Sequence, residues 1–146
     1  MGKLSQSLED YLESIYIISL EKKIVRVKDL VNRMGVKSSS VIGALKKLIS
    51  GGFIEHEHYG HIEMTPEGEK RAERLYEKHK TLTRFFNKIL NVNKDTAEKD
   101  ACEIEHYISD ETYYKIIKLI QHIEASTDSN LKWMEELKEL VKENVK

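Results

Sequence analysis

The chain has 146 residues, of which 40% are hydrophobic and 34% are charged. This length and composition are typical of an ordinary soluble protein with one or two small folded units. No apolar run is long enough to span a bilayer, and residues 1–16 lack the uninterrupted apolar core of a signal peptide. We therefore expect a cytoplasmic protein without a membrane partner.

Charge is distributed unevenly, although the formal net charge is only −1. Residues 20–50 contain eight lysines and arginines against two acidic residues, whereas residues 93–111 contain seven acidic residues against two lysines. A basic segment suits a polyanion such as DNA, and an acidic segment suits a cation. Two solvated surfaces of different charge would give the same pattern, so charge alone does not decide the function.

Apolar residues recur at helical spacing in two early segments. Residues 5–20 are predicted to form an amphipathic helix capped by Ser5 or Ser7. Residues 27–34 are predicted to form a shorter helix that ends at Gly35, since glycine readily adopts the left-handed conformation that closes a helix.

A third helix is predicted after a tight turn at residues 36–38. Ser38 or Ser39 is expected to cap this helix, whose periodic apolar positions end before residues 51–52, a glycine pair. Two short helices joined by a glycine-containing turn predict a helix-turn-helix.

Residues 53–65 read FIEHEHYGHIEMT, with β-favouring residues on both sides of a Tyr-Gly pair. This pattern predicts a β-hairpin, which after a helix-turn-helix forms the wing of a winged helix. His56, His58 and His61 lie near its tip. A metal site is one interpretation of these histidines, but contact with phosphate or water explains them more simply.

The second half of the chain is predicted to be helical throughout. Thr65 is expected to cap a long helix that begins at Pro66 and continues to Leu90. Further helices are predicted over 94–108, 110–124 and 130–144, the last of them amphipathic.

The predicted fold class is mainly α. It combines an N-terminal winged helix-turn-helix DNA-binding domain with a small β-hairpin wing, over residues 1–70, and an all-helical domain over residues 71–146.

The second helix of a helix-turn-helix enters the major groove with its N-terminal residues near the base edges. Hydroxyl groups and lysines on its exposed face suit phosphates and grooves. Neither serine nor glycine makes the bidentate contacts by which arginine, asparagine or glutamine discriminate bases, so the operator sequence is not predicted. The predicted DNA-binding residues are Arg26, Lys28, Lys37, Ser38, Ser39, Ser40, Gly43, Lys46, Lys47 and Tyr59.

The acidic segment contains the strongest chemical pattern. Cys102, Glu105 and His106 stand at positions i, i+3 and i+4, so one helical face presents a thiolate, a carboxylate and an imidazole. Cys102 is the only cysteine and cannot form an internal disulfide, so it is available as a metal ligand or as a buried thiol.

Further donors lie elsewhere in the chain. Asp10 and Glu13 are one turn apart in the first predicted helix, and His79 lies in the long helix. Each residue taken singly has an ordinary interpretation, because exposed acids, solvated histidines and small buried cysteines are common.

The segments LEDYLESIY, VKSSSVIGALKKL, LYEKH and DACEIEHYIS resemble the diphtheria toxin repressor and manganese transport regulator family of metal-dependent repressors, over residues 5–124. The resemblance implies a homodimer that binds double-stranded operator DNA when loaded with metal and controls metal-ion uptake genes. It implies that the helical domain, residues 71–146, is the metal-binding and dimerisation domain. It also implies that the chain is not an enzyme and has no small-molecule substrate. The implied metal ligands are Asp10, Glu13, His79, Cys102, Glu105 and His106.

The ligand set mixes two branches of this family. Asp10 and Glu13 resemble the manganese branch, whereas Cys102 resembles the iron branch. At the ancillary site of the iron branch, this chain has Thr83 and Glu98 in place of glutamate and histidine. A thiolate favours Fe(II), while carboxylates and imidazoles also accept Mn(II), so we expect Fe(II) with Mn(II) close behind.

Two alternatives stay open from the sequence. The first is a winged-helix regulator that responds to a signal other than a metal. The second is a non-haem iron enzyme that uses His79, Glu105 and His106 as a two-histidine, one-carboxylate site. No substrate pocket is evident in the sequence, and an enzyme would leave the basic helix-turn-helix without a role.

Overall fold

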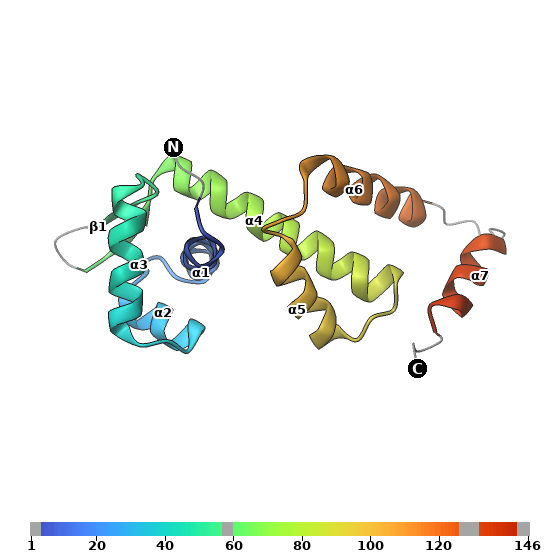
Figure 1. Cartoon of the computed structure of the whole chain (residues 1–146), viewed down its shortest axis with the longest axis horizontal. Helices are drawn as coiled ribbons and strands as arrows, with labels where there is room; N and C mark the ends of the chain where they lie inside the picture. The colour runs from blue at the N-terminus through green and yellow to red at the C-terminus, as the bar shows by residue number, and fades with distance from the viewer. Residues whose placement is uncertain (1–3, 57–59, 126–131, 143–146) are drawn as a thin grey trace. The chain divides into compact units, whose positions relative to one another are not determined.

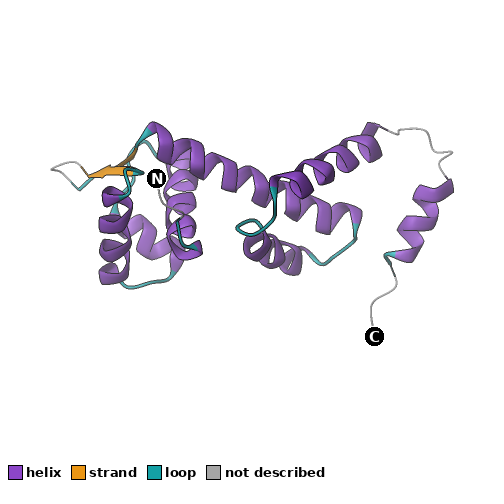
Figure 2. Cartoon of the chain, turned by 45° about the horizontal axis from the view of Figure 1, so that its top comes forward, coloured by secondary structure: helices purple, strands orange, loops and turns teal. Residues whose placement is uncertain are grey.

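A computed structural model describes residues 4–56, 60–125 and 132–142. The chain forms two compact units, residues 1–76 and 77–146. The predicted domain boundary near residue 70 stays a prediction. Figures 1 and 2 show a mainly helical chain with one small sheet, as predicted. Within the described ranges, no helix is both long and apolar enough to pass through a bilayer.

The elements in chain order are α1 (Gln6–Glu21), α2 (Val27–Met34), α3 (Ser38–Ser50), β1 (Ile54–His56), β2 (Ile62–Met64), α4 (Pro66–Arg84), the π-helical turn η1 (Phe85–Ile89), α5 (Lys94–Ile104), α6 (Asp110–Ala125) and α7 (Lys132–Leu140).

Helix α1 forms the centre of the first unit and packs against α2 and α3 (Figure 1). Ser5 is its N-cap, and the Ser5 hydroxyl accepts a hydrogen bond from the Leu8 amide at 3.4 Å, as predicted. The buried side of α1 includes Leu12, Ile15 and Ile18, at the i, i+3 and i+6 positions that an amphipathic helix turns toward a core.

Helix α2 has the predicted bounds. The Asp29 carboxylate accepts a hydrogen bond from the Arg26 amide at 3.0 Å and pairs with the Lys22 ammonium at 2.6 Å. The bond from Lys22 is the main reason that the pKa of Asp29 lies below its usual range, although burial opposes this shift. The helix ends at Gly35, whose φ of 65° is the left-handed conformation expected of a helix-ending glycine.

The predicted cap of α3 was wrong. Lys37 is the N-cap, and its carbonyl accepts from the amides of Ser40 and Val41, at 3.0 and 3.2 Å. Ser38 and Ser39 are therefore already inside the first helical turn, where their side chains are exposed. The helix begins at Ser38, one residue earlier than it would with Ser38 as the cap. Lys37 has an extended backbone and caps the helix without a side-chain hydrogen bond.

The wing consists of two antiparallel strands, β1 and β2, in which Ile54 pairs with Met64 and His56 pairs with Ile62. Val25 adds an isolated bridge to Ile62. The predicted hairpin is confirmed. The predicted turn pair is Tyr59-Gly60, and of these Tyr59 lies outside the described residues, as does His58.

Helix α4 begins as predicted, with the Thr65 hydroxyl accepting from the Gly68 amide at 3.1 Å. Its predicted end at Leu90 was wrong, because regular α-helix stops at Arg84 and the π-helical turn η1 follows. The Leu90 amide bonds to the Phe85 carbonyl, five residues back, at 3.1 Å. Turn η1 packs against both α5 and α6.

Helix α5 ends at Ile104, four residues before the predicted end. The amides of Tyr107 and Ile108 both turn back to the Ile104 carbonyl, at 3.0 and 2.9 Å. The Lys78 ammonium donates to the Ile108 carbonyl at 3.2 Å, so a side chain of α4 satisfies the backbone where the helix has stopped.

The last two helices, α6 and α7, are present as predicted. The Ser109 hydroxyl accepts from the Thr112 amide at 3.2 Å, in the manner of an N-cap for α6. Helix α6 extends one residue beyond the predicted 110–124, and α7 lies inside the predicted 130–144. Residues 130, 131, 143 and 144 of that prediction lie outside the described residues.

Candidate metal centre and DNA-binding surface

A histidine–carboxylate pair lies at the end of α5 in the second unit. His79 comes from α4, and Glu105 follows the last residue of α5 as its C-cap. The distance between His79 Nδ1 and Glu105 Oε2 is 2.8 Å. The Glu105 side chain has no exposed surface, whereas 27% of the His79 side chain is exposed. The pair therefore joins a fully buried carboxylate to a partly accessible imidazole.

The second carboxylate oxygen of Glu105 is unusual. Among the described residues it has no hydrogen-bond partner, although it is buried. His106 Nε2 lies 3.6 Å away, and the His106 side chain is only 1% exposed. An incompletely bonded buried carboxylate is costly unless a cation or a donor compensates it. A carboxylate with two neighbouring imidazoles fits a divalent transition metal.

The other predicted ligands lie on two helices. Cys102 stands one turn before Glu105 on α5 and is partly exposed. Asp10 and Glu13 are one turn apart on α1, in the first unit, and Glu13 is buried. Within the described part of the second unit, no three histidine, cysteine, aspartate or glutamate residues each bring a ligand atom within 4.8 Å of the others. The complete six-residue ligand set therefore stays a prediction.

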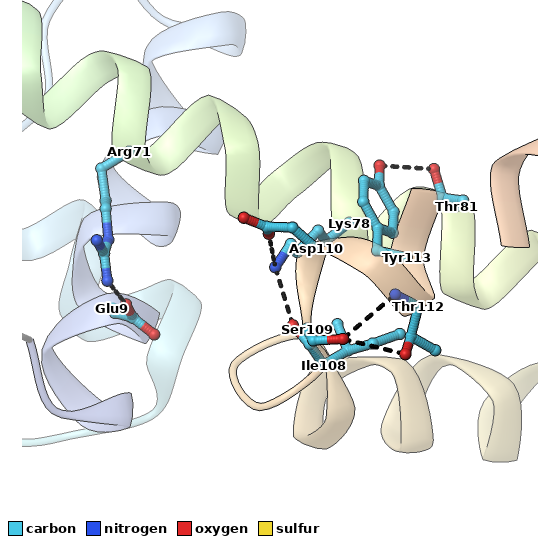
Figure 3. Close-up of polar contacts among 9 residues, drawn as sticks. All are labelled: Glu9, Arg71, Lys78, Thr81, Ile108, Ser109, Asp110, Thr112 and Tyr113. Carbon is cyan, nitrogen blue, oxygen red and sulfur yellow. Dashed lines mark hydrogen bonds and ion pairs between the residues drawn. The ribbon is translucent and has the colours of Figure 1, made fainter. Parts of the chain in front are cut away.

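Glu9 is a buried acid beside Asp10, but its role differs. Its carboxylate is bound by the Arg71 guanidinium of α4, within the first unit (Figure 3). An ion pair of this kind satisfies the buried charge of Glu9 and attaches α1 to the start of α4.

Lys78 is a buried residue that the sequence pattern did not predict. Its ammonium donates to the Ile108 carbonyl at 3.2 Å, lies 3.3 Å from the Asp110 carboxylate and faces the Tyr113 ring (Figure 3). Lysines are rarely buried without such partners. In the sequence, the one indication that Lys78 could matter for the site was its position directly before His79. Lys78 thus fixes the loop between α5 and α6, two residues after His106.

Six of the ten predicted DNA-binding residues lie on α3. All nine that the structure describes are exposed. Those of α3 lie opposite its buried residues, which include Val41, Leu45 and Leu48. The tenth, Tyr59, lies outside the described residues. One exposed residue of α3 that the prediction omitted is Ile42.

A winged helix with a basic recognition helix, followed by a helical unit with a buried carboxylate–imidazole cluster, defines the class of metal-dependent transcriptional regulators.

Two family descriptions match the chain. One is the iron dependent repressor N-terminal DNA binding domain, at residues 3–62, and the other is the iron dependent repressor metal binding and dimerisation domain, at residues 65–134. The chain therefore belongs to the iron-dependent repressor family, which confirms the predicted resemblance.

Similar proteins are transcriptional regulators. The chain is 37% identical over 109 residues to an uncharacterised HTH-type transcriptional regulator of Methanocaldococcus jannaschii, covering 74% of this chain and 87% of that protein. It is 33% identical over 138 residues to the HTH-type transcriptional regulator MntR of Bacillus pumilus, covering 94% and 92%. These relatives confirm the prediction that the chain is not an enzyme.

Solved structures confirm the fold class. The T. acidophilum IdeR structure matches with a TM-score of 0.69 at 26% identity, covering 83% of this chain and 56% of that chain. The manganese regulator SloR matches with a TM-score of 0.71 at 27% identity, covering 78% and 53%. This chain spans about half the length of these two structures.

Proposed function

We propose that this chain is a cytoplasmic repressor that binds operator DNA as a homodimer when loaded with Fe(II) or Mn(II), and that it controls genes of metal-ion uptake. The observation that supports this proposal best is the buried Glu105 carboxylate, which contacts His79 at 2.8 Å and has His106 at 3.6 Å. Membership of the iron-dependent repressor family supports the same function.

The proposed ligands supply one thiolate, three carboxylates and two imidazoles. The thiolate favours Fe(II), while the oxygen-rich remainder also suits Mn(II), so we place Fe(II) first and Mn(II) close behind. A bound ion would supply positive charge that compensates the clustered carboxylates. The ligands are Asp10, Glu13, His79, Cys102, Glu105 and His106.

The proposed ligands belong to both units, and this explains how metal would control DNA binding. Asp10 and Glu13 lie on α1, inside the winged-helix unit, whereas Cys102, Glu105 and His106 lie in the helical unit. Ligands shared in this way make metal affinity depend on how the units are arranged. A metal then favours the arrangement that allows both winged helices of a dimer to reach their half-sites.

On the DNA side, the exposed lysines and serines have separate roles. Lys46 and Lys47 neutralise phosphates, while the first-turn serines and the α3 N-terminus approach the groove. Arg26, Lys28 and Lys37 extend the basic surface, and Tyr59 is proposed as a contact from the wing.

Metal-dependent DNA binding tests the proposal. Duplexes would first be selected from a random library with metal-loaded, anaerobically handled protein. The affinity of the protein for these duplexes would then be measured with Mn(II), with Fe(II) and with chelator. Allosteric coupling of usual size predicts an affinity about 5- to 150-fold higher with metal. Equal affinity in chelator would leave a winged-helix regulator of another signal as the better description.

A matched pair of variants locates the site. Glu105→Gln removes the buried charge and is expected to abolish the metal response while DNA binding without metal persists. Glu103→Gln changes an exposed acid of the same helix and is expected to preserve the response. A full response in Glu105→Gln would show that the ligand assignment is wrong.

A further inference from the structure

Ile42 is an exposed apolar side chain within a polar surface. It is 45% exposed and lies on α3, three residues after Ser39 and four before Lys46, so these three side chains share one side of the helix. Ser39 and Lys46 are themselves exposed. A hydroxyl and an ammonium therefore flank a branched hydrocarbon on the surface proposed to face DNA.

The folding of the first unit does not require isoleucine at this position. The core is covered by the opposite side of α3, including Val41, Leu45 and Leu48. A β-branched residue is slightly less favourable than a straight-chain one inside an exposed helix. Single exposed apolar residues are common, so the significance of Ile42 depends on its surroundings rather than on its exposure.

The neighbouring residue leaves the Ile42 side chain accessible. Gly43 has no side chain, and a Cβ added there would meet nothing within 4 Å. The surface beside Ile42 is therefore open, and the helix backbone is able to approach a groove closely. Ile42 also lies near the start of α3, the part of a recognition helix that contacts base edges.

The major groove offers one apolar group, the C5-methyl of thymine. Serine hydroxyls bond to several bases, lysine favours guanine and glycine has no side chain, so none of these residues selects thymine. Isoleucine has no hydrogen-bonding group, so it recognises a base only by apolar contact. We infer that Ile42 contacts a thymine methyl group in each half-site and contributes to the choice of operator. This inference rests on the proposed DNA binding.

Substituting deoxyuridine for thymine isolates this contact, because deoxyuridine pairs with adenine and lacks only the methyl group. The full chain, loaded with Mn(II), would be titrated against selected operators in which each thymine is replaced in turn. Loss of one buried methyl group predicts about fourfold weaker binding at one thymine of each half-site. In Ile42→Ala, replacing that thymine is expected to change affinity by less than about twofold.

Ile49 provides the matched control. It is an exposed isoleucine of the same helix, two turns farther from the N-terminus. Ile49→Ala is expected to keep the full difference between thymine and deoxyuridine. Circular dichroism and Mn(II) binding would verify that both variants are folded.

The results separate this inference from the proposed function. Metal-dependent binding without a sensitive thymine, or a thymine effect that persists in Ile42→Ala, overturns the role of Ile42 alone. Failure to select any metal-dependent duplex overturns the proposed function together with the inference.

Discussion

Gly68 and Gly43 both lie inside helices, but their surroundings predict opposite effects of alanine. A Cβ on Gly68 would overlap the Phe53 carbonyl oxygen, where α4 passes close to the chain before β1. Gly68→Ala is expected to destabilise the protein by about 3 kcal/mol, since the obstacle is backbone. Gly43→Ala meets open space and is expected to stabilise it by about 0.5–1 kcal/mol, because alanine restricts the unfolded chain.

Urea unfolding of the two variants and the wild type measures both effects, with circular dichroism as the signal. Gly43 lies on the proposed DNA surface, so stability and not DNA affinity is the relevant measurement for it. A Gly68→Ala protein as stable as wild type would contradict the close approach to Phe53.

Individual residues differ in how far sequence predicted them. Helical spacing singled out Cys102, Glu105 and His106, and the structure brings Glu105 to 2.8 Å from His79. The role of these residues as metal ligands stays a prediction. Lys78 was not found, because its burial depends on a loop 30 residues away in the chain. Periodicity reports which face of a helix is apolar, but it does not report which polar groups meet across a fold.

At the level of elements, the sequence predicted which helices exist better than where they end. Helix α2 was predicted to the residue, because Gly35 ends it locally. Helix α5 was predicted four residues too long, since its end depends on tertiary contacts such as that of Lys78 with Ile108. The π-helical turn η1 was not predicted either, because a hydrogen bond to the fifth residue back leaves no clear mark in the apolar spacing.

The attachment of α4 to the loop between α5 and α6 leads to a prediction about metal affinity. Lys78→Met keeps the aliphatic stem but removes the donor to Ile108, so the segment after His106 is expected to loosen. Loss of a partner that orients metal ligands weakens binding by about 10-fold or more. Isothermal titration of the full chain with Mn(II) measures this change.

Lys80→Met is the matched control for this experiment. Lys80 lies on the same helix, but its side chain is exposed and pairs at 2.6 Å with the exposed Glu77. Its removal is expected to leave metal affinity unchanged, since an exposed ion pair contributes little. If Lys78→Met also binds Mn(II) with wild-type affinity, the loop does not position the ligands.

For the whole molecule, the order of the two functional parts was readable from sequence. The change from a basic segment to an acidic one, together with the wing pattern after the third helix, separated a DNA-binding part from a metal-binding part. Neither pattern carries information on how a metal in one part affects the other. That question concerns the free energy of coupling between two binding events, and it is open to measurement.

If metal and operator DNA bind cooperatively, linkage requires the effect to be reciprocal. The factor by which saturating Mn(II) tightens operator binding must equal the factor by which saturating operator tightens Mn(II) binding. Fluorescence anisotropy gives the first factor and isothermal titration of the protein–operator complex gives the second. We expect both to lie between about 5 and 150, the usual range of allosteric coupling.

Two comparisons make this measurement decisive. Glu105→Gln is expected to reduce both factors to about one, because the coupling requires the buried carboxylate. Duplexes without the selected sequence are expected to give smaller factors, since non-specific binding depends mainly on phosphates rather than on a fixed spacing of two winged helices. If both factors stayed well above one in Glu105→Gln, the metal would act through ligands other than the buried carboxylate, and the proposed ligand set would be wrong.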